Sequence, residues 1–556
     1  MATKAQPAAA AETLRRTANY HASVWGPRFF ASIPFDESVF ESYTKQVEEM
    51  KVQVRNMLTD SKVSDVETVK LINLLCRLGV SYHFESEIED FLNQAIDSMH
   101  NLACQNDVCD LDTTAILFRV FRQFGYKMSC DVFNKFRDSD GNFKESLAKD
   151  VKGMLSLYEA SHLIMHGENI LDKALVYTST RLLKFVESEC ESPLAKHIAY
   201  ALQQPFHKGI PRIESKQYIS FYEEDESSNE MLLKFAKIDY NLLQVFYQRE
   251  LSQLSSWYDT LDIPSNFPYA RERIAEVHMW SVAVYFEPCY SDARIILSKV
   301  ITMISILDDT YDLYGTIEEL WLLTDAIDRW DVDVIVQLPN YMKFLYSSLL
   351  NVYHEFENQL KSEGRSYAVS YAKYAMKELS RGYRVEAEWF HTGIVPTFDE
   401  YLENGLITSS YHTILSGSFL GMGEIAGMDA FEWLKSKPKI LQASMAIGRL
   451  MNDIVSHKDE QKRGDAASGV EVYMKQYGIS ETEAVKYVEN KVSDAWKDIN
   501  EGHVRPNTMS IHLFMRVVNL SRATHFFYKF DDKYTDPRST KDYVKALFVD
   551  KIPLGA

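Results

Sequence analysis

The sequence predicts an all-α protein made of two helical domains. The chain has 556 residues, which at about 150 residues per domain allows three to four domains or two large ones. It holds 22 glycines and 15 prolines, about 7% of the chain where roughly 12% is usual. This scarcity of helix breakers favours long helices. Apolar residues also recur at helical spacing rather than in alternation, as at Val69, Ile72 and Cys76.

Composition excludes several classes of protein. The 60 basic and 79 acidic residues give a net charge of −19, which repels phosphate backbones and makes nucleic acid an unexpected partner. No apolar stretch approaches the ~20 residues of a membrane-spanning helix. Six scattered cysteines without a C-x-x-C pair indicate reduced thiols. Residues 1–14 show neither a signal-peptide core nor transit-peptide character, so we expect a cytoplasmic protein.

One composition shift predicts the domain boundary. Between Gly209 and Glu230 the chain carries a proline, an acidic run and a serine pair before helical patterning resumes. We therefore expect domains at residues 1–228 and 229–556. No period of 20–50 residues recurs, which disfavours a helical solenoid.

Two further loops are predicted in the second domain. One spans Trp257 to Pro268 and leads into Arg271 and Arg273, and the other spans Lys458 to Gly469. Each lies beside an acidic motif.

The first acidic motif is ILDDTYDLYG, in which Asp308, Asp309 and Asp312 follow the mostly apolar run 300–307. On a helix Asp308 and Asp312 share a face, and Asp309 lies one residue round. Such carboxylates repel each other unless a cation lies between them, and hard oxygen ligands suit Mg²⁺. A solvated helix end is the alternative, but the apolar run favours a buried helix that opens into a cavity.

The second motif is MNDIVSHKDE, which places Asn452, Ser456 and Glu460 four residues apart on one helix face. An amide, a hydroxyl and a carboxylate can bind another hard cation without accumulating charge. A polar surface stripe is the alternative for this motif alone. Two such faces on different helices of a bundle can hold a diphosphate between them.

Basic and aromatic residues complete the predicted site. Arg271, Arg273 and Arg449 lie near the two motifs, and guanidinium groups bind phosphate oxygens in bidentate fashion. Taken singly, each arginine is better explained by a surface salt bridge than by phosphate binding. The second domain is also rich in aromatic residues, including Trp280 and Tyr528. Most belong in a core, but a subset lining a dry pocket would stabilise a carbocation through the ring quadrupoles.

The set of motifs resembles the plant terpene synthases, and most closely the cytosolic sesquiterpene synthases. DDTYD at 308–312 resembles the aspartate-rich motif of that family, and NDIVSHKDE at 452–460 resembles its second metal motif. Arg271-x-Arg273 is similar to the family R-x-R element. Arg15-Arg16, separated from Trp25 by eight residues, is similar to the tandem-arginine motif. Further similar segments lie at 77–88, 157–161, 236–244, 285–288 and 534–537, so the resemblance covers nearly the whole chain.

The resemblance implies a C-terminal metal-dependent ionisation domain and an N-terminal domain that is not catalytic. The family's protonation-type cyclases need D-x-D-D, and Asp138-Ser-Asp140-Gly departs from that pattern. The N-terminal segment is expected to fold over the mouth of the site. Thr408, Ser409 and Ser410 fall where the family has a polar, irregular stretch of pocket helix.

The resemblance also implies a role for each site residue. Three Mg²⁺ ions, for which Mn²⁺ can substitute, would be held by Asp308, Asp312, Asn452, Ser456 and Glu460, with Asp309 in support. Arg271, Arg273 and Arg449 would stabilise the departing diphosphate. Trp280 and Tyr528 resemble pocket aromatics, and Asp532 an acidic residue beside them. The expected protein is a monomer that converts farnesyl diphosphate to a cyclic sesquiterpene, with the loop at Lys458 to Gly469 as a lid.

Three alternatives remain at the level of the sequence. A monoterpene synthase acting on geranyl diphosphate would carry a plastid transit segment. A chain-elongating prenyltransferase would have a second aspartate-rich motif in place of Asn452, Ser456 and Glu460. A helical scaffold without enzymatic activity would keep all its properties when Asp308 or Asn452 is replaced.

Overall fold

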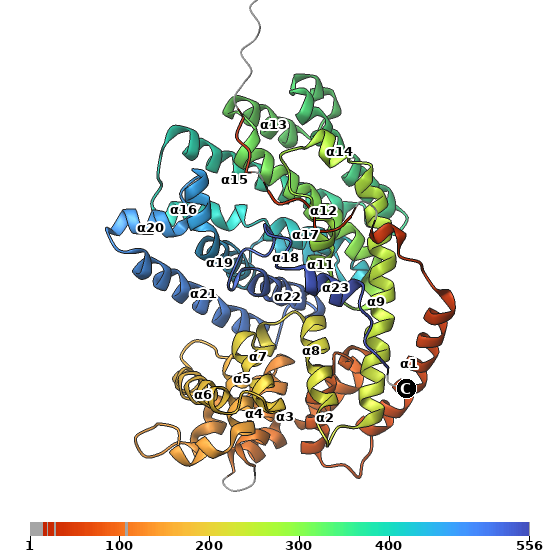
Figure 1. Ribbon diagram of the computed structural model, residues 1–556, viewed down its shortest axis with the longest axis vertical. Coiled ribbons are helices and arrows are strands. Elements are labelled where there is room, and N and C mark those ends of the chain that lie inside the picture. Colours follow the sequence, from red (N-terminus) through yellow and green to blue (C-terminus); the bar gives the residue numbers. More distant parts are fainter. Residues whose placement is uncertain (1–14, 19, 27–28, 106–108, 555–556) are drawn as a thin grey trace, which may run out of the picture.

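The structure, a computed structural model, describes residues 15–18, 20–26, 29–105 and 109–554. Residues 1–14 lie outside this set. The prediction that the chain lacks a transit segment depends on these residues. The described chain is helical throughout (Figure 1), and its only strand-like pairing is an isolated bridge between Arg137 and Phe143. No helix in the described ranges is long and apolar enough to cross a membrane.

The first group of helices forms the lower part of the molecule in Figure 1. It consists of α1 (Glu37–Leu58), α2 (Asp65–Leu78), α3 (Glu85–Cys104), α4 (Leu111–Gln123), α5 (Val151–Ser161), α6 (Asn169–Ser188), α7 (Pro193–Gln203) and α8 (Pro211–Glu223).

The remaining helices form a larger bundle above it. They are α9 (Glu230–Asp259), α10 (Ile263–Asn266), α11 (Ile274–Val284), α12 (Ser291–Asp309), α13 (Ile317–Arg329), α14 (Asn340–Lys361), α15 (Tyr367–Thr392), α16 (Phe398–Thr408), α17 (Tyr411–Leu420), α18 (Met428–Lys435), α19 (Lys439–Arg463), α20 (Gly469–Tyr477), α21 (Glu481–His503), α22 (Ile511–Tyr528) and α23 (Lys541–Phe548).

Helix α9 connects the two parts of the fold. Leu232, Phe235 and Ile238 in its first half pack into the core of the N-terminal helices. Leu243 and Leu251 in its second half pack into the core of the C-terminal bundle. One continuous helix therefore contributes to both cores, and a division at 228/229 stays a prediction.

Two predicted loops are shorter than the composition suggested. Residues 211–223 form helix α8, because Pro211 takes the first helical position, where its missing N–H is not needed. Ile213 and Ile219 of that helix are buried. Helix α19 continues through Lys458 to Arg463 and ends only at Gly464, which adopts φ 75° as a left-handed cap. Charged residues form helices readily when one face of the helix is solvated. The runs of charged residues therefore did not mark where these two helices end.

Candidate active site

A cavity of about 400 Å³ lies inside the C-terminal bundle. Helices α12, α15 and α19 form its polar rim, and α11, α17 and the chain after α22 contribute aromatic and aliphatic walls. Predicted residues from both acidic motifs line this one space: Asp308, Asp312, Asn452 and Glu460. The predicted arginines and pocket residues that also line it are Arg271, Arg449, Trp280, Tyr528 and Asp532. The fold thus brings together side chains that lie about 140 residues apart in the sequence.

Helix α12 delivers the first acidic motif. The residues before the aspartates are buried, among them Val300, Ile304 and Leu307, so the helix end opens inward rather than to solvent. After Asp309 the helix widens into a π-helical turn, Thr310–Tyr314, a distortion that is frequent at functional sites. Asp312 reaches the cavity from this turn.

Arg271 is tied to the aspartates of this helix. Its Nη2 donates to Asp308 Oδ2 at 2.6 Å, and its backbone N–H donates to Asp309 Oδ2 at 2.9 Å. Burial raises the pKa of Asp309, and the positive charge of Arg271 opposes this rise. Asp309 is 1% exposed and does not line the cavity; its carboxylate contacts Arg271 instead.

Arg273 is directed away from the cavity. Its guanidinium donates to four backbone carbonyls, those of His21, Glu272, Tyr534 and Thr535, at 2.7 to 3.1 Å. The two arginines of the R-x-R element therefore differ: Arg271 lines the cavity, whereas Arg273 fastens the N-terminal segment to the chain after α22.

Helix α19 presents the second motif. Asn452 and Glu460 line the cavity. Ser456 is not among the lining residues, and its hydroxyl donates to the Asn452 carbonyl at 2.9 Å. Burial raises the pKa of Glu460 to about 7 and that of neighbouring Asp453 to about 6. Asp453 accepts from Tyr401 Oη at 2.9 Å and from the Gly469 N–H at 3.2 Å, which fixes the base of the following loop.

Glu386 of α15 is a cavity carboxylate that sequence reasoning missed. It accepts from Thr408 Oγ1 at 2.6 Å and lies 3.4 Å from Arg449 Nη2. Burial raises its pKa. A single glutamate in a helical stretch gives no local signal, because only the packing of α15 against α13, α16 and α17 brings it to the site.

The cavity carboxylates repel each other. Burial raises the pKa of Asp312 well above its usual range, and the charges of Asp308, Glu386 and Asp465 raise it further. Hard divalent cations prefer oxygen ligands, and this cavity gathers carboxylate and amide oxygens in one space. A bound cation would also offset the repulsion between the carboxylates. The residues present therefore fit a divalent metal.

The helix facing this site is interrupted where polar residues were predicted. Helix α16 ends at Thr408, Ser410 takes φ 67°, and α17 begins at Tyr411. Thr408, Ser409 and Ser410 all line the cavity. Thr408 also accepts from Arg449 Nη2 at 2.7 Å, so the break positions that guanidinium.

Aromatic rings form the opposite wall. Trp280 stacks on Phe527 with centroids 4.5 Å apart and lies 6.3 Å from the ring of Tyr528. Asp532 accepts the N–H groups of Tyr534 and Thr535 at 3.1 and 2.9 Å. It therefore shapes the turn after α22 as well as lining the cavity.

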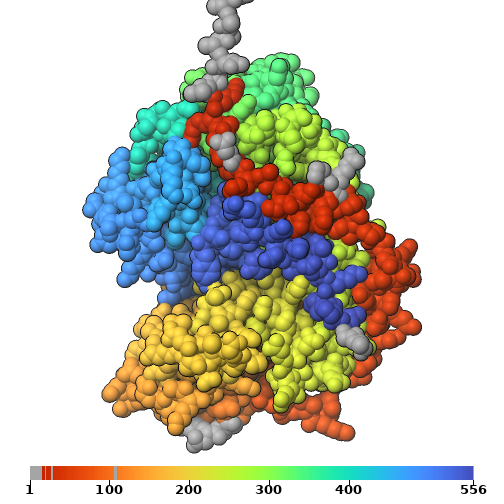
Figure 2. Space-filling view, viewed as in Figure 1, coloured from red at the N-terminus to blue at the C-terminus, as the bar shows by residue number. Residues whose placement is uncertain are grey.

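The N-terminal segment covers the rim of the site, and Figure 2 shows it as a red band across the C-terminal bundle. Arg15 binds both oxygens of Glu319 at 2.7 and 2.8 Å. Arg16 binds Asp465 Oδ1 at 2.5 Å in the loop after α19. Tyr20 lines the cavity, and its ring lies 5.1 Å from the Arg271 guanidinium carbon. Sequence reasoning had not identified Tyr20 or Asp465.

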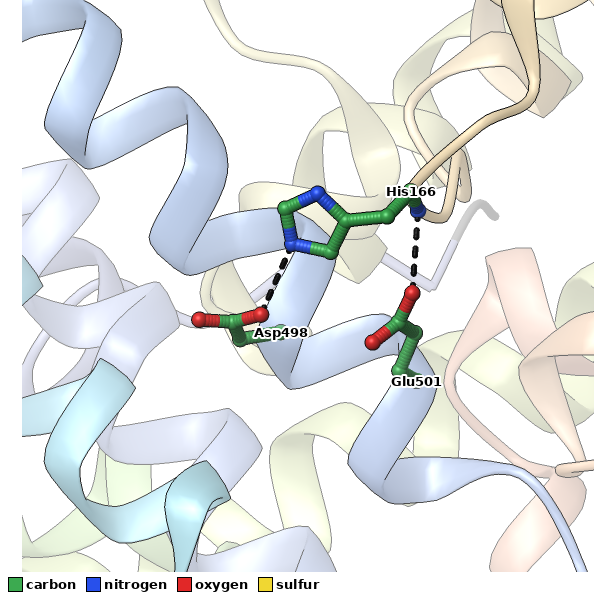
Figure 3. Close-up of side chains that lie close together, drawn as sticks. All are labelled: His166, Asp498 and Glu501. Atoms are coloured by element: carbon green, nitrogen blue, oxygen red, sulfur yellow. Dashed lines mark hydrogen bonds and ion pairs between the residues drawn. The ribbon is translucent and has the colours of Figure 1, made fainter.

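A second cluster of potential ligands lies elsewhere. Within the described ranges, one group of three His, Cys, Asp or Glu side chains has ligand atoms within 4.8 Å of one another: His166, Asp498 and Glu501 (Figure 3). His166 Nε2 lies 2.7 Å from Asp498, and its backbone N–H donates to Glu501. Lys439 Nζ lies 2.7 Å from Asp498 and 3.4 Å from Glu501. Both carboxylates thus already pair with Lys439, and the cluster joins α21 to the loop after α5.

Two family models match the chain. The model described as "Terpene synthase, N-terminal domain" matches residues 24–202, and "Terpene synthase family, metal binding domain" matches residues 259–498. This chain belongs to the terpene synthase family. The resemblance inferred from the motifs is confirmed, as is the all-helical, two-domain fold.

Individual relatives match over nearly the full length. Casbene synthase, chloroplastic, from Ricinus communis is 49% identical over 98% of this chain and 90% of its own. Valerianol synthase TPS1B from Camellia hiemalis is 46% identical over 98% of both chains. A crystal structure of isoprene synthase from grey poplar, in complex with three Mg²⁺ ions and dimethylallyl-S-thiolodiphosphate, has TM-score 0.86 at 33% identity and covers 95% of this chain and 99% of that one.

A structure of limonene synthase with 2-fluorolinalyl diphosphate has TM-score 0.91 at 29% identity and covers 97% of this chain and 100% of that one. As a terpene synthase with the metal-binding domain, the protein is a lyase that acts on a prenyl diphosphate and depends on a divalent metal. The cavity residues described above are the candidates for that chemistry.

Proposed function

We propose that this terpene synthase is a sesquiterpene synthase, which ionises farnesyl diphosphate and quenches the cyclised cation as a cyclic sesquiterpene hydrocarbon or alcohol. The observation that carries the proposal is the single cavity shared by two polar helix ends and an aromatic wall. The polar end suits a diphosphate, and the apolar end suits a prenyl chain.

Asp308, Asp312, Asn452 and Glu460 would hold the metal, with Ser456 beside them and Glu386 as a further carboxylate. We propose Mg²⁺, three ions as in the isoprene synthase complex, with Mn²⁺ as a substitute. When bound, the metal neutralises the diphosphate and makes it a better leaving group.

The chain's own groups would perform the remaining tasks. Arg271 and Arg449 line the polar end and would bind diphosphate oxygens in bidentate fashion. Arg273, which the motif predicts as a diphosphate ligand, does not line the cavity and would act indirectly by anchoring the N-terminal segment. The rings of Trp280 and Tyr528 would stabilise positive charge on the chain as it folds, and Asp532 would lie near the cation.

Water must be excluded while the cation exists. Residues 465–468 line the cavity, and the N-terminal segment binds this loop through Arg16. We propose that the loop and the segment together close the site over the substrate.

The length of the prenyl chain is the finer question. The relatives include valerianol synthases, which suggest a sesquiterpene, and casbene synthase, which makes a diterpene. Geranyl diphosphate, the substrate of a monoterpene synthase, is the alternative we carry from the sequence. We further propose a cytoplasmic monomer, in keeping with the predictions above.

The test is headspace and solvent-extract mass spectrometry of products from the purified protein. Geranyl, farnesyl and geranylgeranyl diphosphate are supplied separately, each with Mg²⁺ or with chelator. The proposal requires metal-dependent cyclic C15 products and a kcat/KM for farnesyl diphosphate at least tenfold above the other two. Turnover confined to the C10 or C20 substrate would overturn the chain-length assignment and leave the family chemistry intact.

A further inference from the structure

A cluster of basic side chains lies between the two helical parts, away from the cavity. From the N-terminal part come His162 after α5 and Lys208 in the short helix Phe206–Lys208. From the C-terminal part come His525 of α22 and Lys529 directly after it, which are one turn apart on the same face.

Trp496 of α21 lies at the centre of this cluster. Lys208 Nζ lies 5.1 Å above its ring, and the ring of His525 meets it edge-on at 6.1 Å. Lys529 donates to the Gln203 carbonyl at the end of α7. Asn500, one turn further along α21, donates to the His162 carbonyl at 3.1 Å. The groups therefore form one site across the interface.

Several buried side-chain nitrogens in this site have no hydrogen-bond partner. They are both ring nitrogens of His525, Nε2 of His162 and Nε1 of Trp496. The three side chains are at least nine-tenths buried. More than nine in ten buried polar groups in proteins are paired, and an unpaired one costs about 1–3 kcal/mol. A neutral histidine carries one N–H and one bare nitrogen, so these four atoms offer up to three N–H donors. Unpaired donors gathered in one cluster indicate a site for an acceptor that the protein itself does not supply.

The electrostatics of the cluster point in the same direction. Burial lowers the pKa of Lys208 to about 7, and the charge of Lys529 lowers it further. Burial also lowers the pKa of Lys529 to about 8. The pKa of His525 lies well below its usual range because of burial and then of these two lysines. The strongest charge acting on Lys208, on His525 and on His162 is thus cationic, although the chain as a whole is acidic with a net charge of −19.

From this geometry we infer that the interface between the two helical parts holds a binding site for a phosphate-type oxyanion, formed by Lys208, Lys529, His525, His162 and Trp496. Two ammonium groups and several N–H donors around one point suit such an anion. Binding would link helix α22, which leads to the cavity wall at Tyr528, to the N-terminal helices.

Two sources share this chemistry: inorganic phosphate, and the diphosphate that the proposed reaction releases. The second source rests on the proposed function, whereas the phosphate arm of the test does not. Because an anion favours the charged lysines, binding near pH 8 is expected to take up protons from the buffer.

The experiment is isothermal titration of the full-length protein with phosphate, and separately with diphosphate, in chelator so that no metal assists binding in the cavity. Wild type is compared with Lys529→Met, Lys208→Met and Lys529→Arg. Lys45→Met is the matched control, because Lys45 is an exposed side chain remote from the interface. We expect at least tenfold weaker binding in both interface Met variants, retention in Lys529→Arg and no change in the control.

Repeating the titration in buffers of different ionisation enthalpy measures the proton uptake, which a purely structural role would not produce. If Lys208→Met fails to fold by circular dichroism, Lys529→Met still decides the question, since Lys529 is only partly buried. Wild-type-like binding in Lys529→Met, or no binding by wild type at millimolar anion, would overturn the inference. Loss of binding in Arg449→Met but not in Lys529→Met would assign the anion to the cavity and also overturn it.

Discussion

At the scale of single residues, Asp308 is attracted by one neighbour, Arg271, and repelled by another, Asp312. Arg271 neutralises it at 2.6 Å, and its own charge raises the pKa of Asp312. The attraction to Arg271 is therefore opposed by repulsion within the acidic motif. We propose that a bound cation relieves the repulsion between Asp308 and Asp312.

Replacing Asp308 by Asn is expected to lower kcat/KM for the prenyl diphosphate on the order of 100-fold, a typical effect of removing one electrostatic contact to a reacting group. Thermal unfolding should change little, because the amide keeps an acceptor for Arg271. Asp292→Asn, at the exposed start of the same helix, is the control and should retain full activity. Equal activity in the two variants would speak against Asp308 as a ligand.

Glu250 of α9 is a second residue whose charge matters, here for stability. It accepts from Arg294 Nε and Nη2 at 2.8 and 2.6 Å and lies 3.3 Å from His278 Nε2. All three residues are buried. Burial would raise the pKa of Glu250, but Arg294 and His278 outweigh it and hold the pKa at about 2.

A lowered carboxylate pKa contributes stability above the unfolded value near 4.3, and this contribution disappears as the pH falls toward 2. Glu250→Gln should therefore cost about 3–5 kcal/mol at pH 7, because Arg294 is left buried without its counter-ion. The variant should also lose less stability than wild type between pH 5 and pH 3. Denaturant unfolding at several pH values measures both effects. Glu48→Gln, an exposed pair with Lys51, should stay within about 1 kcal/mol of wild type.

At the scale of elements, the rim of the cavity depends on two segments that touch. The N-terminal segment binds the loop after α19 through Arg16 and Asp465. Arg16 also donates to the Asp312 carbonyl at 3.2 Å, and its guanidinium lies 4.5 Å from the ring of Phe390. One arginine thus contacts the lid loop, the first metal motif and α15.

Arg16→Met is expected to lower turnover and shift products toward acyclic and hydroxylated species, because water enters when the rim is loosened. The midpoint of thermal unfolding should move little, since a partly exposed ion pair contributes at most about 1 kcal/mol. Product profiles by gas chromatography and mass spectrometry measure the shift, and Arg381→Met, an exposed pair with Asp328, is the control. If Asp465→Asn adds its full effect to that of Arg16→Met, the two residues do not act as a pair.

At the scale of the whole molecule, helix α9 makes the two helical parts interdependent. Its first half belongs to the core of the N-terminal helices, and its second half to the core of the C-terminal bundle. Figure 1 shows this helix running along one side of the molecule from the lower group into the upper one. A cut at 228/229 would expose Leu232, Phe235 and Ile238, all of which are buried in the intact chain.

The fragment 229–556 produced alone is therefore expected to aggregate and to lack activity, because a helix face of this kind is an exposed apolar patch. Co-expression with fragment 1–228 should restore solubility and part of the activity. Sedimentation and turnover of each preparation test this. A soluble, active fragment 229–556 would show that α9 belongs wholly to the catalytic part.

The sequence by itself determined the helical fold class, the family and the two metal motifs, because each depends on residues close together in the chain. Helical periodicity and the spacing of Asp308 to Asp312 and of Asn452 to Glu460 are local properties. The cavity confirms that these motifs meet, because residues of both line it.

Tertiary structure alone decided which distant side chains share the site and which do not. Glu386, Tyr20 and Asp465 carry no local signal, yet packing brings them to the cavity. Arg273 was assigned to the diphosphate by its motif, but its backbone partners lie elsewhere. The direction of a side chain depends on the contacts of its whole helix. The proximity of His525 and Lys208 across the interface likewise depends on how their helices pack. Such contacts join residues hundreds of positions apart, which is why spacing in the sequence does not reveal them.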